Sequence, residues 1–353
     1  MSLSRWRRRA FACLALLTAC SQSEPFTNPD VTNEGPLAPT EPLRLTYNIG
    51  EDSTPAAHPD GASLLYSFTR PDIQGRDQCL ALLPAGGGTQ RDLCPNSAGS
   101  RDSTDFYAEP AWIDGNTIAL RRAARLIGRD RDDYVVLGTA TAPDFQDVTA
   151  RVRFPYSTPA GLVHLFPTHV TPLGGGRVAY IAETQLSGLP CGNPCPYDWT
   201  HAGREVMVVD LAGDGPPTSV PGTDYPTGLS LGPDAGDLLF TRADDSRVFR
   251  RAADGTVDVL HDFGAVARDV TWRAGRLAAI VGGDLLILTS VNGEPSQVDG
   301  GGTLAVVDLA TGEPVLPADT TLRLRRPSLA PDGRAVFVQT GATAVDLYRV
   351  AAP

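Results

Sequence analysis

The sequence contains no lysine, and all 30 of its basic residues are arginine. A chain without lysine has no amine for a Schiff base, no P-loop lysine for a bound phosphate and no Ser–Lys dyad. It also lacks the H-E-x-x-H motif of zinc peptidases and the G-x-G-x-x-G motif of dinucleotide-binding domains. We further expect no nucleophile elbow of the hydrolase type. These absences exclude several large classes of enzyme.

Long hydrophobic runs are missing as well. The apolar stretch from Ala10 to Leu17 is far shorter than the ~20 residues that a membrane-spanning helix needs. It follows Arg5, Arg7, Arg8 and Arg9, and this order is typical of a secretory signal peptide. We therefore expect residues 1–19 to be removed on export.

The signal ends in Leu17-Thr18-Ala19-Cys20, which resembles the lipobox of bacterial lipoproteins. The resemblance implies that Cys20 carries the lipid, with palmitate among its acyl chains, and becomes the first mature residue. The protein is then anchored in the bacterial cell envelope and faces out of the cytoplasm. Ser21 is not the aspartate that retains some lipoproteins in the inner membrane, which favours the outer membrane. The alternatives are an uncleaved anchor or a soluble secreted protein with an incidental cysteine.

The charge of the mature chain is acidic. Without the four arginines of the signal, 26 arginines (30 − 4) face 41 acidic residues, a formal charge of −15 (26 − 41). An acidic surface argues against nucleic acid and against anionic membrane surfaces as partners. The hydrophobic content of 42% is sufficient for a folded core.

Four further cysteines remain after Cys13 and Cys20: Cys79, Cys94, Cys191 and Cys195. An even number of cysteines outside the cytoplasm indicates disulfides. The spacing favours Cys79–Cys94, across a hairpin that turns at Ala85 to Gly88, and Cys191–Cys195 as a loop bridge. The alternatives for Cys191 and Cys195 are a metal site with His201 or a redox pair, but the spacing is neither a zinc signature nor C-x-x-C.

Residues 20–42 contain the lipidated cysteine and a segment rich in Pro, Ser, Thr, Asn and Glu, with no sustained apolar period. This composition predicts a flexible tether. Residues 43–353 then form the folded domain.

That domain is a repeat. One element occurs six times, as a strand, a Pro-Asp-Gly-like turn and an apolar strand, with starts 42 to 59 residues apart. The copies are PAAHPDGASLLYSFT from Pro55, EPAWIDGNTIALRR from Glu109, PTHVTPLGGGRVAYIAE from Pro167, PTGLSLGPDAGDLLFTR from Pro226, RDVTWRAGRLAAIVG from Arg268 and RPSLAPDGRAVFVQT from Arg326. A second pair of strands follows most copies, and no segment has a long helical period. Four strands per repeat predict a β-propeller of six blades, an all-β fold.

The P-x-x-x-PDG-x-x-hydrophobic pattern resembles the WD40-like repeats of TolB-type β-propellers. Pro55 to Thr69 and Pro327 to Thr340 match it best, whereas the third and fifth copies replace the turn with Gly-Gly-Gly and Ala-Gly. The resemblance implies the fold and not the function, because such repeats occur in binding proteins, peptidases and lyases. The N-terminal domain of TolB itself has no counterpart among these residues.

The last copy has only three strands, and residues 43 to 48 (LRLTYN) form a strand before the first copy. A single blade leaves both of its faces exposed, so the repeats must close into a ring. We predict that this N-terminal strand is the outer strand of the last blade and closes the ring.

The connections differ in length between the two ends of the ring. Those between first and second strands are short turns, whereas the loops after second strands and between blades are long: residues 70–77, 96–108, 122–133, 153–165, 184–203 and 290–301. Long loops on a rigid scaffold are commonly used for recognition. We expect the partner-binding face there, with Tyr107, Tyr156, Trp199 and Tyr225 as candidate contacts.

Two classes of function stay open. The first is a binding or scaffold module for a protein, peptide or glycan, which needs no cofactor and which we expect to be a monomer. The second is a metal-dependent hydrolase or lyase that acts from the channel, where His58, His164 and His169 precede or begin inner strands. The sequence contains no catalytic motif and no metal signature, which favours the first class.

Overall fold

The computed structural model describes the residues of the folded domain in several stretches, all within the unit that spans Gly35–Pro353. The described ranges are 42–47, 50–69, 78–93, 103–126, 132–140, 150–154, 156–157, 162–186, 202–210, 213, 215–283, 285–289, 295–315, 322–341 and 345–352. The predicted signal, Cys20 and nearly all of the tether lie outside them. The described residues include no helix long and apolar enough to cross a membrane.

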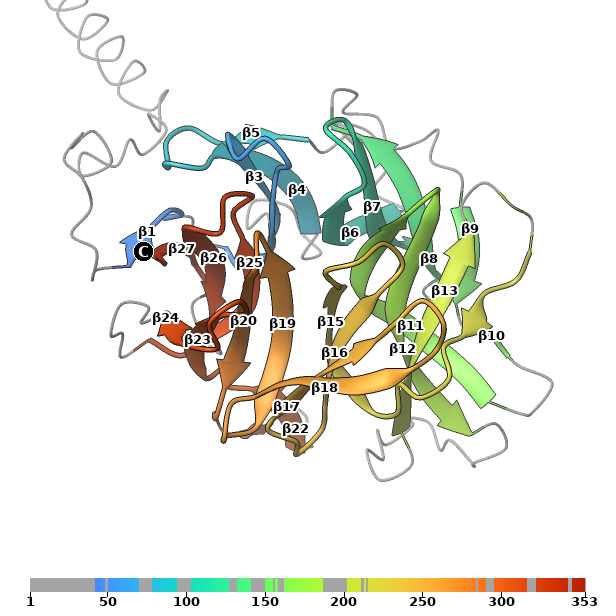
Figure 1. The fold of residues 1–353 in the computed structure, drawn as a ribbon. Helices are drawn as coiled ribbons and strands as arrows, with labels where there is room; N and C mark the ends of the chain where they lie inside the picture. The colour runs from blue at the N-terminus through green and yellow to red at the C-terminus, as the bar shows by residue number, and fades with distance from the viewer. Residues whose placement is uncertain are drawn as a thin grey trace, which may run out of the picture. The chain divides into compact units, whose positions relative to one another are not determined.

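Among the described residues, six antiparallel sheets of four or five strands are the blades of a β-propeller (Figure 1). In every blade the innermost strand lines the centre: β2 (Asp52–Ala57), β6 (Ser103–Trp112), β11 (Leu162–Gly174), β15 (Pro226–Leu231), β19 (Ala267–Arg273) and β25 (Leu324–Leu329). Each of these strands contacts the innermost strand of the next blade, and β25 contacts β2, so the ring is closed. The sequence prediction of a six-bladed propeller is confirmed.

The other strands follow in order outward. The second strands are β3 (Ser63–Thr69), β7 (Thr117–Leu126), β12 (Arg177–Leu186), β16 (Leu238–Arg242), β20 (Arg276–Val281) and β26 (Ala335–Thr340). The third are β4 (Gln78–Pro84), β8 (Asp132–Thr139), β13 (Ala202–Asp210), β17 (Arg247–Arg251), β23 (Thr303–Asp308) and β27 (Leu347–Ala351). The outer are β5 (Arg91–Asp92), β9 (Ala150–Phe154), β14 (Thr218–Ser219), β18 (Val257–Asp262), β24 (Pro314–Val315) and β1 (Leu43–Arg44). Blade 3 adds β10 (Tyr156–Ser157), and a hairpin of β21 (Leu285–Thr289) and β22 (Pro295–Asp299) lies between β20 and β23 in the chain.

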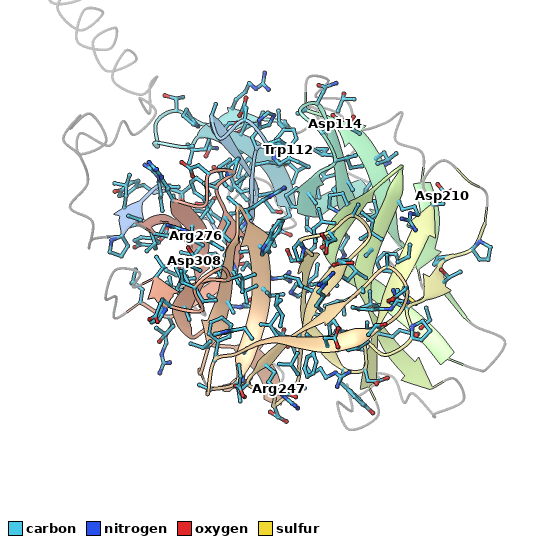
Figure 2. All side chains as sticks on the ribbon, viewed as in Figure 1. Trp112, Asp114, Asp210, Arg247, Arg276 and Asp308 are labelled. Atoms are coloured by element: carbon cyan, nitrogen blue, oxygen red, sulfur yellow. The ribbon has the colours of Figure 1, made fainter. Side chains whose placement is uncertain are left out.

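The short turns between first and second strands are formed by the Asp and Gly residues of the Pro-Asp-Gly-like repeat. Gly61 and Gly333 have positive φ of 75° and 70°, which glycine adopts without steric cost. The carboxylate of Asp60 accepts a hydrogen bond from the N–H of Ala62 at 2.7 Å. Asp114, which is labelled in Figure 2, accepts hydrogen bonds from the N–H groups of Asn116 and Thr117 in the same way. These hydrogen bonds lower the pKa values of both carboxyl groups.

Six hydrophobic clusters, one at each junction between neighbouring blades, form the core. In β3, Leu64 and Tyr66 face blade 6, and Leu65 faces blade 2. A second strand therefore buries both faces, which is why its sequence is a continuous apolar run rather than an alternating one. Burying one leucine side chain contributes about 1.5–3 kcal/mol to the stability of the fold. A blade without its neighbours would lose this contribution on both faces of its second strand.

The ring closes through the N-terminal strand, as predicted. β1 pairs with β27 in antiparallel register, so the first described strand lies beside the last (Figure 1). The N–H of Leu45 donates to the carbonyl of Leu347 at 2.7 Å, and Arg44 forms a 2.8 Å ion pair with Asp346. The fourth strand of blade 6 thus comes from the opposite end of the chain.

The hairpin of β4 and β5 has the predicted register. Ala81 lies opposite Asp92 and Leu82 opposite Arg91, which is the register that a Cys79–Cys94 bridge requires. Cys79 is disulfide-bonded, but its partner lies outside the described residues, as do Cys191 and Cys195. Both pairings therefore stay predictions.

Candidate functional site in the central channel

Five innermost strands have the same distortion at the same place. A residue other than glycine has a φ in the left-handed region at Thr54 (52°), Glu109 (53°), His169 (52°), Asp269 (38°) and Arg326 (50°). Each lies at a shift in the register between the first and second strands of its blade. Such a conformation costs on the order of 1–3 kcal/mol, and repeated strain of this kind is a reason to look for function.

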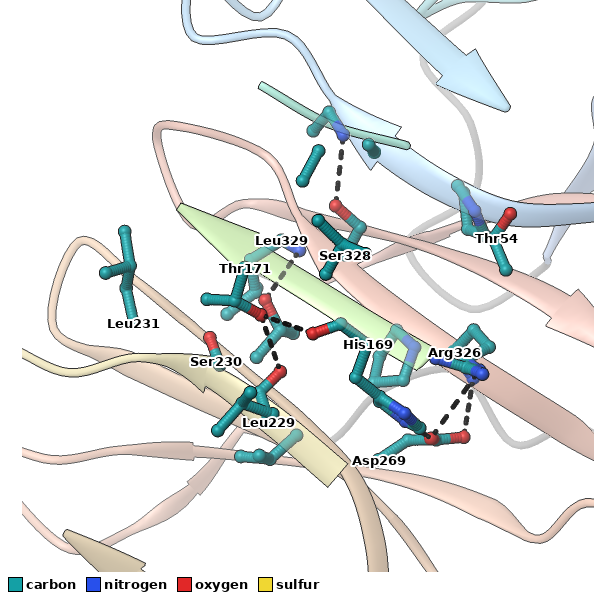
Figure 3. A pocket seen from close by; sticks show the side chains of 18 of the residues that line it. Thr54, His169, Thr171, Leu229, Ser230, Leu231, Asp269, Arg326, Ser328 and Leu329 are labelled. Carbon is teal, nitrogen blue, oxygen red and sulfur yellow. Dashed lines mark hydrogen bonds and ion pairs between the residues drawn. The ribbon is translucent and has the colours of Figure 1, made fainter. Parts of the chain in front are cut away.

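Four of these residues are ionisable, line the channel and contact one another; we call Glu109, His169, Asp269 and Arg326 the channel tetrad. Arg326 donates from both terminal nitrogens to the carboxylate of Glu109, with Nη1–Oε2 of 3.0 Å and Nη2–Oε1 of 2.9 Å. Nε2 of His169 lies 2.8 Å from Oδ1 of Asp269 (Figure 3). The tetrad joins four blades across the channel.

Backbone groups complete this network. The N–H of His169 donates to Oε2 of Glu109 at 2.9 Å, and the N–H of Arg326 donates to Oδ2 of Asp269 at 3.0 Å. Both N–H groups are available because the bulges detach them from the second strands. All four carboxylate oxygens are therefore paired, and every side chain of the tetrad is 16% exposed or less.

Burial and pairing act in opposite directions on the acids. Burial opposes the ionisation of Glu109, but Arg326 and His169 outweigh it and lower its pKa. Burial likewise opposes the ionisation of Asp269, and the hydrogen bond from His169 together with Arg326 lowers the pKa of Asp269 strongly. For His169, burial and the nearby Arg326 lower the pKa, so the imidazole is neutral at neutral pH and donates its Nε2–H to Asp269.

Blade 4 does not contribute to the tetrad. Its register shift falls between Pro226 and Gly228, and Gly228 has no side chain to project. A Cβ at Gly228 would lie 2.6 Å from Cα of Asp269, so glycine is required for the close approach of blade 5.

Two residues beyond the tetrad level, small side chains form a second layer, which we call the collar: Ala56, Ala111, Thr171, Ser230, Thr271 and Ser328. Some of these hydroxyls join neighbouring innermost strands. Ser328 accepts a hydrogen bond from the N–H of Ala57 at 3.0 Å, and Thr171 donates to the carbonyl of Leu229 on β15 at 3.5 Å. The collar surrounds a cavity of about 160 Å³.

This pocket extends from the tetrad to the ends of the innermost strands, which lead into the short turns. Its floor is the tetrad and its walls include Trp112, Leu231, Trp272 and Arg273. The pocket therefore lies on the short-turn side of the channel, whereas the sequence analysis placed the functional face on the long-loop side.

The tetrad does not fit a metal ion. The guanidinium of Arg326 is bound to both oxygens of Glu109 and its Nε lies 3.8 Å from Oδ1 of Asp269, so a cation already occupies the space between the carboxylates. In the described part of the chain, no group of three or more histidine, cysteine, aspartate or glutamate side chains is arranged to hold a metal ion. The channel residues present here pair with one another.

Gly228-Leu229-Ser230-Leu231-Gly232 has the spacing of the G-x-S-x-G motif, which the sequence analysis overlooked. In a nucleophile elbow the serine lies on a sharp turn between a strand and a helix. Here Ser230 lies inside β15, and no histidine in the described ranges bonds to it. The motif is therefore coincidental, and the expectation of no nucleophile elbow holds for this segment.

The predicted aromatic contacts have different outcomes. Tyr107 lies in β6 and is only 2% exposed, so its prediction as a surface contact is wrong. Pairing of β6 with β7 extends to Ser103–Leu126, which converts much of the predicted loop into strand and buries the ring. Tyr225 precedes β15 and is 64% exposed. The side chain of Tyr156 and all of Trp199 lie outside the described residues.

The predicted histidines do not form one site. His169 belongs to the tetrad, but His58 stacks edge-on against Trp112 at 4.4 Å and its Nε2 lies 3.0 Å from the carbonyl oxygen of Gly115. The side chain of His164 and all of His201 lie outside the described residues. The sequence prediction missed Glu109, Asp269 and Arg326. An alignment of the six repeat copies would have revealed them, because the position two residues before each collar residue is ionisable in four of the six copies.

No protein-family model matches the chain, and no curated protein matches it in sequence. Solved structures do match. A gluconolactonase from Xanthomonas campestris has a TM-score of 0.56 and 16% identity, covering 89% of this chain and 90% of that one. Regucalcin, a calcium-binding protein from Agrobacterium tumefaciens, has a TM-score of 0.52 and 12% identity over 89% and 96%.

TolB from Acinetobacter baumannii has a TM-score of 0.52 and 16% identity, covering 82% of this chain and 64% of that one. Identities this low show the fold and leave the function open. The chain is a six-bladed β-propeller, similar in fold to enzymes and to TolB.

Proposed function

We propose that this protein is a lipid-anchored binding or scaffold module of the bacterial envelope, whose propeller presents a face to a protein, peptide or glycan. The anchor rests on the signal peptide and the lipobox at Cys20. The TolB-like repeat and the fold support a rigid scaffold on which loops recognise a partner.

The observation that carries this proposal is the complete pairing of the channel tetrad. A general acid or base must reach a proton of the substrate. Here each oxygen of both carboxylates already accepts a hydrogen bond from Arg326, His169 or a backbone N–H group, and both side chains are mostly buried. The channel charges are used to hold four blades together, so function falls to the surfaces.

On the long-loop side, Tyr225 is the candidate contact that the structure describes as exposed. It belongs to the link between blades 3 and 4, where the backbone carbonyl accepts a hydrogen bond from the N–H of Ala243. A tyrosine at the surface of a fixed link offers apolar area and a hydroxyl at low entropic cost.

The alternative is a metal-dependent hydrolase or lyase that acts from the channel. A gluconolactonase with the same fold favours it, but only as an analogy of fold. The position of Arg326 between the two carboxylates argues against it.

A photo-crosslinking amino acid at position 225, in the full lipidated protein in its native envelope, tests the proposal. We expect one discrete cross-linked partner, no such product from position 332 on the short-turn side, and no product when Cys20→Ser removes the anchor. Stoichiometric metal in the purified protein that is lost in Glu109→Gln would favour the enzyme instead.

A further inference from the structure

The pocket wall between blades 4 and 5 contains three polar groups that have no partner among the described residues. Ser230, Trp272 and Arg273 all line it. Within the described ranges, the Ser230 hydroxyl and the Arg273 guanidinium have no hydrogen-bond or ion-pair partner. Nε1 of Trp272 is buried and also unpaired. Burying an N–H without a partner costs about 1–3 kcal/mol, so this wall calls for an explanation.

The equivalent groups at other junctions are paired. Trp112 occupies in blade 2 the position of Trp272 in blade 5, and its Nε1–H donates to the carbonyl of Ala56 at 3.1 Å. Ser328 occupies in blade 6 the position of Ser230 in blade 4, and it accepts from Ala57. The tryptophan N–H and the serine hydroxyl at these positions can therefore be paired within the repeat. At the junction of blades 4 and 5, the described residues provide neither hydrogen bond.

The chemistry of the three groups defines what would complete them. An indole N–H and a guanidinium are donors only, and a serine hydroxyl can donate as well. The complementary group is therefore an acceptor, and the charge of Arg273 makes an anionic acceptor the best match. Arg273 lies at the exposed end of β19, where an incoming anion would meet it first.

The floor of the pocket selects among anions. With His169 neutral, the tetrad has two carboxylates and one guanidinium, a net charge of −1. A floor of this sign disfavours a doubly charged phosphate more than a singly charged carboxylate. We propose that the wall formed by Ser230, Trp272 and Arg273 is a binding site for a carboxylate, entered from the short-turn side.

The indole N–H is closed off from solvent, so a carboxylate oxygen reaches it only after a small displacement of the ring. Trp272 is itself partly exposed and provides an apolar flank beside the anion. Binding should therefore change the fluorescence of Trp272. This site does not rest on the proposed function, because it lies on the other side of the ring from Tyr225.

The carboxylate could belong to a peptide or to an acidic sugar, and matched probes distinguish the two. The full mature lipoprotein in detergent would be titrated with N-acetyl-dialanine and its C-terminal amide, with glucuronate and glucose, and with inorganic phosphate. Tryptophan fluorescence and calorimetry would report binding. We expect one of the two carboxylates to bind, its uncharged counterpart to bind at least about tenfold more weakly, and phosphate to bind more weakly than the carboxylate.

Variants then locate the site. Arg273→Gln should weaken carboxylate binding about tenfold or more, and Ser230→Ala and Trp272→Phe about threefold to tenfold. Arg251→Gln, at a partly exposed arginine of β17 that does not line the pocket, is the control and should leave binding unchanged. Because Arg273 is exposed, melting curves of Arg273→Gln should match wild type and separate lost binding from lost folding. Equal binding of acid and amide, tighter binding of phosphate, or equal losses in Arg251→Gln and Arg273→Gln would overturn the assignment.

Discussion

The channel tetrad and the collar lie two residues apart on the same innermost strands, yet their polar groups are used differently. The tetrad contains full charges at 16% exposure or less, and every carboxylate oxygen has a partner. The collar contains neutral hydroxyls; Ser328 accepts a hydrogen bond, whereas Ser230 has no partner among the residues that the structure describes. An unpaired charge at this depth would cost several kcal/mol, whereas a partly exposed hydroxyl without a partner costs little. The deeper layer is thus committed to stability, and the layer above it can serve a ligand.

Replacing Arg326 should have the largest effect on stability, and it tests whether the channel tetrad stabilises the fold. Arg326→Met leaves Glu109 without its cation, and we expect a loss of about 3–5 kcal/mol in the free energy of unfolding by urea. Ser230→Ala in the collar should change it by less than about 0.5 kcal/mol. The double variant Arg326→Met, Glu109→Met should be more stable than Arg326→Met alone. A loss below about 1 kcal/mol in Arg326→Met would mean that the tetrad does not hold the blades.

The tetrad should also make stability depend on pH. The pKa of His169 is lowered from 6.5 in the folded state, so its contribution is complete above pH 6.5 and is lost as the pH falls towards the folded value. The pKa values of Glu109 and Asp269 are also lowered in the folded state, from ordinary values of 4.5 and 3.8. Both carboxylates therefore stabilise the fold at neutral pH, and this stabilisation is lost as the pH falls below about 4.5. Urea midpoints between pH 8 and about 3 would measure both losses.

A less buried histidine provides the control for this pH effect. Burial also lowers the pKa of His261, which lies on the outer strand β18 and is less enclosed than His169. His261→Gln should therefore leave most of the decline between pH 7 and 5.5, whereas His169→Gln should remove it. Collar variants should keep the wild-type profile, and a profile that His169→Gln does not change would refute this role.

Within the collar, the bonded and unbonded serines should respond differently. Ser328→Ala removes the acceptor of the Ala57 N–H and should cost about 1–2 kcal/mol. Ser230→Ala removes no bond and should be neutral in the absence of ligand. Chemical denaturation of both variants under one condition gives the comparison, and equal costs would show that Ser230 has a structural partner.

The two tryptophans give the smallest and most specific contrast. Trp112→Phe loses the bond to the carbonyl of Ala56 and should cost about 1 kcal/mol beyond the change in ring size. Trp272→Phe removes a buried N–H that has no partner in the described part of the chain, so it should be neutral or slightly stabilising. A cost for Trp272→Phe as large as that for Trp112→Phe would indicate that the N–H is already satisfied in the free protein.

Much of the fold could be predicted from local pattern. Gly61 and Asp60 identify the first turn, because glycine readily adopts the positive φ and the aspartate side chain accepts a hydrogen bond from a backbone N–H of the turn. A capping aspartate recurs at Asp114 and a glycine with positive φ at Gly333. The strand at Leu43 was predicted to close the ring because the last repeat has three strands, and β1 pairs with β27. The loop boundaries were less accurate, since the pairing of β6 with β7 continues past the expected ends.

The sequence by itself determined six blades, their turns and the closure of the ring, because strand period and turn chemistry act over a few residues. It also predicts the lipid on Cys20, from a motif read within the first twenty residues. Only the tertiary structure decided the channel. Glu109 and Arg326 are 217 residues apart and His169 and Asp269 are 100 apart, so no local signal links them. They meet because ring closure brings the same position of every innermost strand to one level, and burial there leaves charged side chains stable only when they pair with one another.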